Sequence, residues 1–253
     1  MTRTFRERIA SAASEKNSRI VLALDPPPGV ARAQEFAEKM ISVVHDYVCS
    51  IKINFHLVLP LSGLEIAQIN RLAHSFGLQS IADIKLNDIV NTNSVAVDHL
   101  VGNMGFDAII ANPIIGQSSV TSLVKKAHSL RAGVIALVYM SQPDAREGYG
   151  LEISDGRKRR RLYEIFLERA SRADADGIVI GATRPNIVKQ AVKEKPAMPV
   201  YSPGIGAQGG DAVRALRSGS SYLIVGRTIV ESKDPAAKAR EMQISTSSLP
   251  VRN

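Results

Sequence analysis

Short apolar runs rich in Val, Ile and Leu alternate along the chain with longer stretches in which apolar residues recur every three or four positions. The short runs predict buried β-strands, and the longer stretches predict amphipathic helices. Alternation of the two is typical of βα units arranged around a parallel sheet. The predicted strands cover residues 19–25, 50–56, 79–86, 108–112, 133–140, 177–182, 199–204 and 221–227.

Eight strand–helix pairs in 253 residues match the (β/α)8 TIM barrel, an α/β fold, in both number and size. A doubly wound open sheet is the alternative, but it more often has about six strands and a glycine-rich turn after the first. Here the segment DPPPG at 25–29 follows the first strand and lacks that turn. We therefore predict a single TIM-barrel domain over 1–253, with an N-terminal helix within 1–18 and a flexible tail over 243–253.

The composition narrows the class of protein. Hydrophobic residues make up 45% of the chain, and the longest apolar runs are well short of the roughly 20 residues that a membrane-spanning helix needs. The first 20 residues contain no apolar segment that could direct secretion, so we expect a cytoplasmic protein without a membrane partner. The one cysteine, Cys49, excludes an internal disulfide and a cysteine metal site.

The formal net charge of +8 raises the question of nucleic-acid binding, because clustered Lys and Arg residues bind phosphates. The densest cluster, DGRKRRR at 155–161, begins with turn residues and lacks the interleaved aromatic residues of single-strand binders. We interpret it as a solvated loop and helix start, and we expect no nucleic-acid partner. A diffuse positive field would also attract a small polyanionic substrate.

Charged residues interrupt the third predicted strand. Asp83, Lys85 and Asp88 lie within six residues of one another in the stretch IADIKLNDIV. Strand alternation places Asp83 and Lys85 on one face, near the mouth of the barrel, where Lys52 of the adjacent strand can reach them. Active sites of TIM barrels lie at this end of the strands. Because a buried ion network brings little net stability, we favour a catalytic role over a structural one.

Two glycine-containing segments follow the last two predicted strands. They are SPGIGAQGG at 202–210 and IVGRTI at 224–229. Loops at these positions of a TIM barrel often bind phosphate, because glycines let backbone N–H groups approach the anion closely. Arg227 could add a charge-assisted contact and Gln208 a neutral donor. The pair predicts a phosphate site, and the alternative is a flexible loop followed by a surface arginine.

Two further polar residues follow predicted strands. Asp25 ends the first predicted strand, beside Lys52. We expect its carboxylate to contact a substrate hydroxyl, and the alternative is that it caps the PPPG turn. Ser141 follows the fifth predicted strand without a nucleophile elbow or a triad partner, which argues against a serine hydrolase. Its hydroxyl could instead form a hydrogen bond with the edge of a heterocycle. No metal site is expected, because no carboxylate lies at ligand spacing from a histidine. The five scattered histidines are His45, His56, His74, His99 and His128.

Several motifs resemble, in order, the orotidine 5′-monophosphate decarboxylase family in its shorter microbial form. They are LALD at 22–25, IKIN at 51–54, DIKLNDI at 83–89, MS at 140–141, SPGIGAQGGD at 202–211 and IVGRTI at 224–229. The Asp-x-Lys-x-x-Asp motif is shared with a wider suprafamily of sugar-phosphate enzymes. Ser141 and the glycine loop with Gln208 resemble the orotidylate enzyme and not its metal-dependent relatives.

The resemblance implies decarboxylation of orotidine 5′-monophosphate to uridine 5′-monophosphate, the last step of de novo pyrimidine biosynthesis, by a carboxy-lyase without metal or cofactor. Lys85 would offset the carbanion at C6 and then protonate it, and Asp83 would lie against the substrate carboxylate. The catalytic residues implied are Lys52, Asp83, Lys85 and Asp88. The substrate-binding residues implied are Asp25, Lys52, Thr92, Ser141, Pro203, Gly206, Gln208, Gly226 and Arg227.

Asp88 and Thr92 match family positions that reach the neighbouring subunit's site, so the resemblance also implies an obligate homodimer. Two alternatives stay open. One is a magnesium-dependent sugar-phosphate decarboxylase or aldolase of the same suprafamily, with Asp25 and Asp83 as ligands. The other is a barrel without enzymatic activity that binds nucleotides or nucleic acid through its positive charge.

Overall fold

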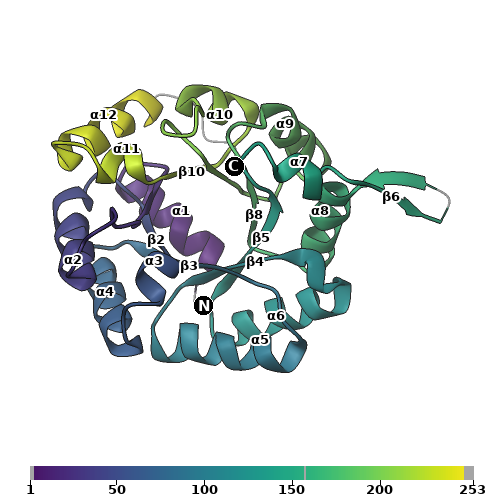
Figure 1. Ribbon diagram of the computed structural model, residues 1–253, viewed down its shortest axis with the longest axis horizontal. Helices are drawn as coiled ribbons and strands as arrows, with labels where there is room; N and C mark the ends of the chain where they lie inside the picture. The colour runs from purple at the N-terminus through teal and green to yellow at the C-terminus, as the bar shows by residue number, and fades with distance from the viewer. Residues whose placement is uncertain (1–2, 157, 248–253) are drawn as a thin grey trace.

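The structure is a computed structural model that describes residues 3–156 and 158–247. Eight parallel strands close into a barrel in the order β1-β10-β9-β8-β5-β4-β3-β2 (Figure 1). Each lies within one of the eight predicted strands, so the predicted TIM barrel is confirmed. The bounds are β1 Ile20–Ala23, β2 Ser50–Asn54, β3 Gln79–Leu86, β4 Ala108–Ala111, β5 Gly133–Tyr139, β8 Gly177–Ile180, β9 Val200–Pro203 and β10 Tyr222–Val225.

Helices surround the barrel because each has an apolar face to bury. In α2, for example, Ala37, Met40, Ile41 and Val44 are buried at helical spacing. The helices are α1 Phe5–Glu15, α2 Ala33–Val44, α3 Phe55–Val58, α4 Gly63–Ser75, α5 Val90–Val97, α6 Gln117–Ser129, α7 Ala145–Gly148, α8 Leu162–Arg172, α9 Pro185–Glu194, α10 Ala212–Ser218, α11 Arg227–Val230 and α12 Pro235–Ser247, with the π-helix η1 Asp98–Asn103 and the 3-10 helix η2 Pro113–Ile115. Within the described ranges, no helix has the length and apolar character needed to cross a membrane.

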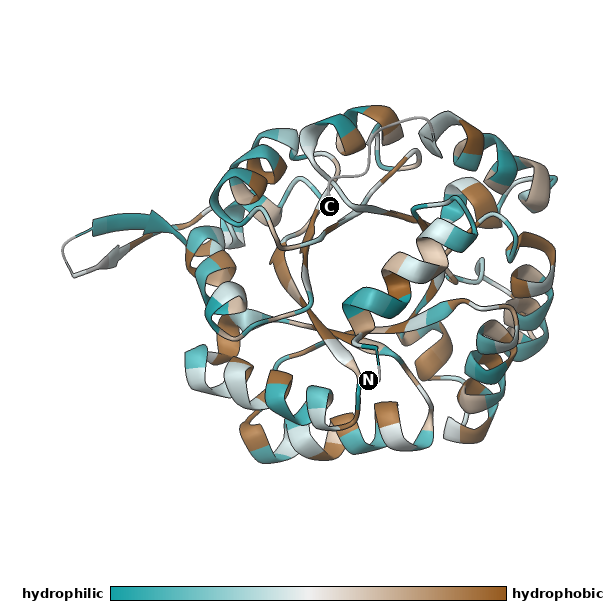
Figure 2. Cartoon of the chain, turned by 180° about the vertical axis from the view of Figure 1, so that it is seen from behind, coloured by the Kyte–Doolittle hydropathy of each residue, from teal (hydrophilic) through white to brown (hydrophobic). Residues whose placement is uncertain are grey.

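Helix α1 lies across the N-terminal end of the barrel (Figure 2). It begins with a capping box, in which the Thr4 hydroxyl accepts a hydrogen bond from the Glu7 backbone and the Glu7 carboxylate accepts one from the Thr4 backbone. Phe5 is 1% exposed and packs against Gly133, where a Cβ would overlap the phenyl ring. Helix α1 therefore covers this end of the barrel, and the strands finish at the opposite end.

The basic cluster has a different structure from the one predicted. Strands β6 (Glu152–Asp155) and β7 (Lys158–Arg161) form an antiparallel hairpin that projects from the barrel (Figure 1). The predicted loop and helix start is therefore wrong, since α8 begins only at Leu162. Gly156 has a φ of 65°, which suits a tight turn, and Glu152 lies opposite Arg161. A hairpin made of charged residues gives no hydrophobic period to detect.

The C-terminal segment also differs from the prediction in part. Residues 243–247 belong to α12, although the sequence predicts a flexible tail from residue 243. The Gln243 side chain donates to the Lys16 carbonyl at 2.6 Å, and Thr246 is buried. These contacts attach the helix end to the barrel. The remainder of the predicted tail, residues 248–253, lies outside the described residues.

Candidate active site

Three charged side chains form a close network at the open end of the barrel, with a fourth nearby. Lys52 Nζ lies 2.9 Å from Asp83 Oδ2, and Lys85 Nζ lies 2.8 Å from Asp83 Oδ1. Asp25 Oδ1 lies 3.9 Å from Lys52 Nζ on the other side. Each oxygen of Asp83 therefore holds one ammonium group, and the predicted contact of Asp83 with Lys85 and Lys52 is present.

The backbone that brings Lys85 to Asp83 is less regular than the predicted strand. The register between β3 and β4 shifts between Ala82 and Leu86, and Lys85 has a φ of 47°. A left-handed backbone is unfavourable for a residue with a side chain, and it persists only where the surrounding structure fixes it. The predicted pairing is present, but a bulge in the strand produces it.

Burial and charge act in opposite directions on Asp83, which is 8% exposed. Burial alone would raise the pKa of the Asp83 carboxyl, but the charges of Lys52 and Lys85 outweigh it and hold this pKa below its usual value. Asp83 is therefore a carboxylate at neutral pH. The Lys52 side chain is 6% exposed and that of Lys85 is 39% exposed, so Lys85 is the cation that opens to the mouth.

Two adjoining cavities lie over this network, of about 170 Å³ and about 200 Å³. They share four lining residues, which are Lys52, Asp83, Pro203 and Ile224. The first is otherwise lined by Lys85, Ile110, Leu137, Met140, Ser141, Gln142 and Val179. The second is otherwise lined by Ala23, Asp25, Asn54, Gly204, Ile205, Ala207, Gln208, Gly226 and Arg227. The pocket thus has a half-apolar section beside Lys85 and a polar section that ends at an arginine.

The loops after β5 and β9 meet above the pocket. Ser141 Oγ donates to Gln208 Oε1 at 2.6 Å. Gly204 has a φ of 93°, and a Cβ there would lie 2.9 Å from both Gln208 Oε1 and Ser141 Cβ. Gly206 has a φ of 70°, and a Cβ there would overlap the Thr228 hydroxyl. These two positions require glycine both for their backbone angles and for space.

Arg227 stands at the polar end of the pocket, at the start of α11. Its side chain forms no ion pair with any residue in the described part of the chain, so the guanidinium is available to an anion. Thr228 Oγ1 accepts from the Ala207 N–H at 3.3 Å, which ties α11 to the glycine loop. Arg227, Gln208 and the glycine loop therefore face one space, as the phosphate-site prediction requires.

Asp88 and Thr92 are exposed at the start of α5 and line neither cavity of their own chain. The Asp88 N–H donates to Asn93 Oδ1 at 3.1 Å, and Asn93 Nδ2 donates to the Asp88 carbonyl at 2.6 Å. These two bonds fix the turn between β3 and α5. The structure thus gathers the other predicted site residues at the mouth and leaves these two outside.

Asn54 is not among the predicted site residues, but it lines the polar cavity two residues beyond Lys52 on β2. Its Oδ1 accepts from the His56 N–H at 2.8 Å, which orients the amide group. The alternation used for Asp83 and Lys85 would have identified it.

Two other missed residues lie after β8 and hold the loop after β5. Thr183 Oγ1 donates to the Ser141 carbonyl at 2.7 Å. Arg184 Nη2 donates to the carbonyls of Gln142 and Pro143, each at 3.3 Å. Both residues act on backbone atoms, so the sequence carried no signal for them.

Asp25 and Asp83 would be the metal ligands of a magnesium-dependent enzyme. The two oxygens of Asp83 already hold ammonium groups, and Lys52 stands between the two carboxylates. A cation placed there would meet Lys52 directly. In residues 3–156 and 158–247, no group of three or more His, Cys, Asp and Glu side chains is placed to hold a metal ion. This donor set suits an organic anion better than a divalent cation.

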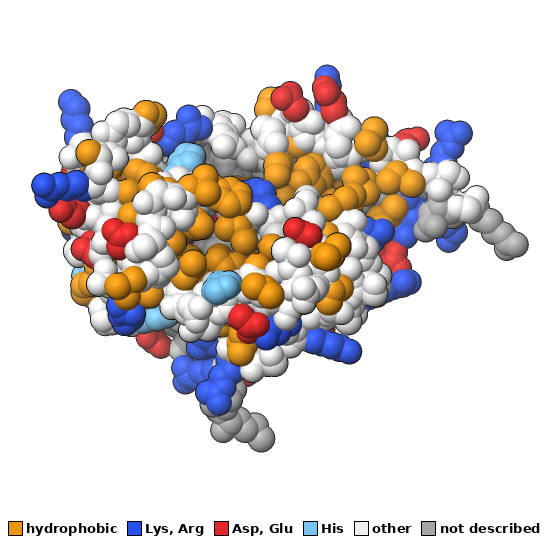
Figure 3. Space-filling view, turned by 60° about the horizontal axis from the view of Figure 1, so that its bottom comes forward, with side chains coloured by type: hydrophobic (Ala, Val, Ile, Leu, Met, Phe, Trp, Pro, Cys, Tyr) orange, Lys and Arg blue, Asp and Glu red, His pale blue; other side chains and the backbone are white. Residues whose placement is uncertain are grey.

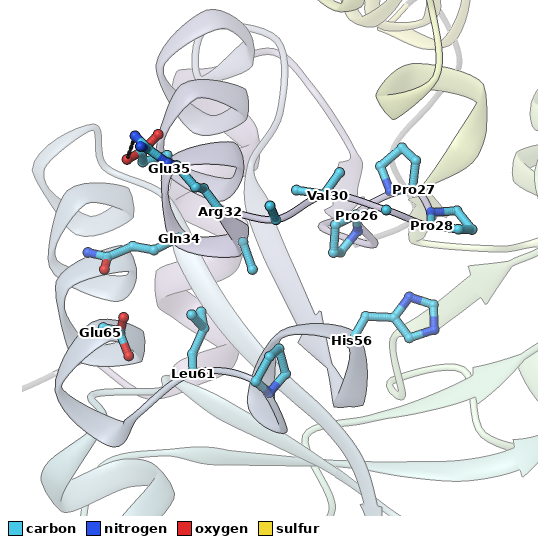
Figure 4. Close-up of a pocket in the computed structure, with 14 residues that line it drawn as sticks. Pro26, Pro27, Pro28, Val30, Arg32, Gln34, Glu35, His56, Leu61 and Glu65 are labelled. Atoms are coloured by element: carbon cyan, nitrogen blue, oxygen red, sulfur yellow. Dashed lines mark hydrogen bonds and ion pairs between the residues drawn. The ribbon is translucent and has the colours of Figure 1, made fainter.

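A separate groove of about 700 Å³ lies outside the mouth (Figure 4). The stiff segment Pro26–Pro28 forms one wall, and α3 with His56 and the start of α4 form the other. Arg32 and Glu35 form an ion pair at its end, at 2.8 Å. None of the predicted site residues lines this groove, so the candidate active site is confined to the two cavities at the mouth.

The chain is similar in sequence to known proteins over most of its length. The model of the family described as "Orotidine 5'-phosphate decarboxylase / HUMPS family" matches residues 18–242. The chain is 36% identical to orotidine 5′-phosphate decarboxylase of Pyrococcus abyssi over 88% of this chain and 96% of that one. It is also 36% identical to the enzyme of that name from Methanococcoides burtonii, over 90% and 97% of the two chains.

Solved structures are similar over the same length. Orotidine 5′-monophosphate decarboxylase from Methanocaldococcus jannaschii, complexed with inhibitor BMP, has a TM-score of 0.77 and 30% identity over 90% of this chain and 97% of that one. Leishmania donovani UMP synthase has a TM-score of 0.85 and 25% identity. The match covers 98% of this chain and 57% of that longer one.

Proposed function

Because the chain belongs to the orotidine 5′-phosphate decarboxylase / HUMPS family, we propose that the mouth of its barrel converts orotidine 5′-phosphate to uridine 5′-phosphate in pyrimidine biosynthesis. The reaction is that of a carboxy-lyase. The observation that carries the proposal is the Lys52, Asp83 and Lys85 network, which lies beside a cavity that ends at Arg227. A nucleotide matches this pocket, with its base in the half-apolar section beside Lys85 and its phosphate at Arg227.

Lys85 supplies the charge that the reaction needs. When the bond between C6 and the carboxylate breaks, CO2 leaves and the electron pair stays on C6, where the pyrimidine has no adjacent electron sink. The Lys85 ammonium offsets this charge and then donates a proton, which forms the C6–H bond and leaves a neutral amine. Its 39% exposed side chain opens toward the pocket, which supports this role.

Asp83 holds Lys85 in position and stays ionised during the reaction. Its lowered pKa and its 2.8 Å contact with Lys85 Nζ support this part of the proposal. The same carboxylate would lie near the substrate carboxylate, and their repulsion would be relieved as CO2 departs. Lys52 balances the charge of Asp83 and, with Asp25, binds the ribose hydroxyls.

The phosphate is bound by Arg227, Gln208 and the glycine loop, including Pro203, Gly206 and Gly226. Its binding energy holds the loop after β9 against Ser141, whose hydroxyl already contacts Gln208. Ser141 would contact the pyrimidine edge at the other end of the substrate. The hydrogen bond between Ser141 and Gln208 thus joins the two ends of the binding site.

The functional unit in this proposal is a homodimer in which Asp88 and Thr92 reach the partner's site. Large apolar side chains are exposed on the segments that follow β2, β3 and β4, and Figure 3 shows hydrophobic side chains gathered on one face of the molecule. Burying such a patch against a second copy would stabilise the pair. The apolar residues are Phe55, Leu59, Leu64, Ile89, Val90, Val95 and Ile114.

An ultraviolet assay that follows the loss of orotidine 5′-phosphate, with and without EDTA, tests the reaction. We expect turnover in both conditions. If EDTA abolished the activity and the chain acted on sugar phosphates, the magnesium-dependent alternative would replace this proposal. A chain that bound DNA with a steep salt dependence and turned over no orotidylate would support the barrel without enzymatic activity.

Mixing two inactive variants tests the shared site. If Asp88 acts in the partner's site, a Lys85→Ala chain and an Asp88→Ala chain together have one intact site in each mixed dimer. Half of the dimers are mixed, so about a quarter of the wild-type activity should return. No recovery after subunit exchange would show that Asp88 acts in the site of its own chain.

A further inference from the structure

The loop that carries Ser141 begins and ends at the same aromatic contact. Tyr139, the last residue of β5, lies two residues before Ser141, and Tyr149 follows α7 at the far end of the loop. The ring centroids of Tyr139 and Tyr149 are 5.7 Å apart. The intervening residues, 140–148, are therefore held at both ends, which reduces the conformations open to the loop.

Two aromatic residues of α8 complete this cluster. Tyr163 packs edge-on against Tyr139 at 5.6 Å, and Phe166 packs edge-on against Tyr149 at 5.9 Å. Such edge-to-face pairs contribute more than the apolar area they bury. Tyr139, Tyr163 and Phe166 are at most 5% exposed, and burial raises the pKa of the half-buried Tyr149, which stays neutral. The cluster is thus a fixed part of the barrel wall.

The β6–β7 hairpin returns the chain to this cluster. At its base, the Leu162 N–H donates to the Leu151 carbonyl at 2.9 Å, and the Tyr163 N–H donates to the Tyr149 carbonyl at 3.0 Å. The hydrogen-bond ladder of the hairpin therefore continues to Tyr149 and Tyr163. The hairpin holds Tyr149 by its backbone while the rings hold it by its side chain.

We propose that Tyr149 is a positioning residue for Ser141, fixed in place by the β6–β7 hairpin. The inference rests on the proposed function, in which Ser141 contacts the pyrimidine edge. Thr183 and Arg184 hold the loop from one side, and the aromatic cluster fixes its ends. A loop held in this way presents the Ser141 hydroxyl to Gln208 and to the base without being ordered anew in each cycle.

Ligand binding to Tyr149→Ala tests this role, with calorimetric affinities for uridine 5′-phosphate and for ribose 5-phosphate as the two readouts. Only the first ligand has a base for Ser141 to contact. We expect the affinity for uridine 5′-phosphate to fall about five- to tenfold and that for ribose 5-phosphate to change less than about twofold. Tyr149→Phe keeps the ring and should restore both affinities.

Phe76→Ala is the matched control, because Phe76 is a half-buried ring that stacks on His45 at 3.9 Å, away from the mouth. It should leave both affinities unchanged. If Tyr149→Ala does not fold, Tyr149→Leu removes the ring geometry and keeps apolar volume. Equal weakening of both ligands, or wild-type affinity for both, overturns the proposal.

Hydrogen exchange of residues 140–148 in the unliganded chain separates this inference from the proposed function. Tyr149→Ala should speed exchange in this loop, and Phe76→Ala should not. A wild-type chain that fails to decarboxylate would overturn the proposed function while the exchange result still reports on the loop. Unchanged exchange in Tyr149→Ala would overturn the bracing itself.

Discussion

Both ends of the barrel hold carboxylates between cations, but the partners of these carboxylates differ. At the mouth, the oxygens of Asp83 contact only lysine ammonium groups among the described residues, and the network borders a cavity. We call the N-terminal end of the barrel, which α1 covers, the bottom. There Asp107 and Asp176 each contact an arginine of α1, a histidine near the end of an outer helix and a backbone N–H at a strand. The comparison separates a network available to a ligand from one used to hold the fold together.

Asp107 precedes β4 and joins three elements. Its Oδ1 lies 3.1 Å from Arg8 Nη2, and its Oδ2 lies 2.7 Å from His74 Nε2 and accepts from the Ser80 N–H at 2.8 Å. Burial alone would raise the pKa of the Asp107 carboxyl, but the contacts with His74, Ser80 and Arg8 lower it. The carboxylate thus ties α1 to α4 and to β3.

Asp176 precedes β8 and repeats this arrangement. Its Oδ2 lies 2.9 Å from His128 Nε2 and accepts from the Val134 N–H at 2.9 Å, while Arg6 Nε lies 3.9 Å from its Oδ1. A carboxylate that also accepts a backbone N–H is fixed by the chain itself and has little left to offer a ligand. A buried acid held only by side-chain cations, beside a cavity, is the stronger candidate for chemistry.

Lys85→Ala should have the largest effect on activity of the changes considered. It removes both the charge beside C6 and the proton donor, so kcat should fall at least about 10⁴-fold. The melting temperature should stay near that of the wild type, because Lys52 still pairs with Asp83. Turnover at saturating substrate and a thermal melt measure the two quantities. A variant that is unfolded would mean that the mouth network is structural, like the one at the bottom.

Arg227→Ala should have the next largest effect, confined to substrates that carry a phosphate. Loss of a charge-assisted contact should lower kcat/KM for orotidine 5′-phosphate by about a hundredfold. The slow decarboxylation of orotidine, which has no phosphate, should be almost unchanged. Steady-state kinetics on the two substrates make the comparison, and equal losses on both would contradict the phosphate role.

Asp176→Asn should lower the stability and leave kcat almost unchanged, which is the opposite of the result expected for Lys85→Ala. The Asn carbonyl can still accept from Val134, but Arg6 and His128 lose the charge between them, which should lower the free energy of unfolding by about 2–3 kcal/mol. Asp174→Asn is the control, because the Asp174 side chain is 83% exposed and its contact with Arg6 is worth little. Urea unfolding measures both. A drop in kcat without a loss of stability would give the bottom network a part in catalysis.

The strands of the barrel could be predicted because parallel strands are buried on both faces and appear as continuous apolar runs, as in Gly133–Tyr139. Lys52 and Asp83 could be identified for the same reason, since a charge inside such a run stands out. The hairpin at Glu152–Arg161 could not, because its pairing depends on a turn and on opposed charges. Thr183 acts through the Ser141 carbonyl, and a threonine in a loop gives no sign of such a contact.

The bottom network was missed for a related reason. Asp107 and Asp176 each stand directly before a strand, a position where an aspartate most often ends a turn. Their arginine partners, Arg8 and Arg6, are about 100 residues or more away in the chain. Only the docking of α1 brings these groups together.

The smallest expected effect is a change in the stability of the fold with pH, and it arises at the bottom of the barrel. The hydrogen bond to Asp176 raises the pKa of His128 above its usual value of 6.5, and burial opposes this only in part. Because the folded pKa exceeds the unfolded one, the protonated imidazole stabilises the fold. That contribution is complete below about pH 6.5 and is lost as the pH rises through the folded pKa.

The side chain of His128 is 40% exposed and partly screened, so the contribution should be about 0.5 kcal/mol or less. Thermal melts of the wild type should fall slightly between about pH 6 and pH 8, and those of His128→Gln should fall less over this interval. His56→Gln removes an exposed imidazole near the mouth and should follow the wild type. If His128→Gln retained the full pH dependence, the proton that stabilises the fold would be bound elsewhere, and the bottom network would hold α1 through its arginines alone.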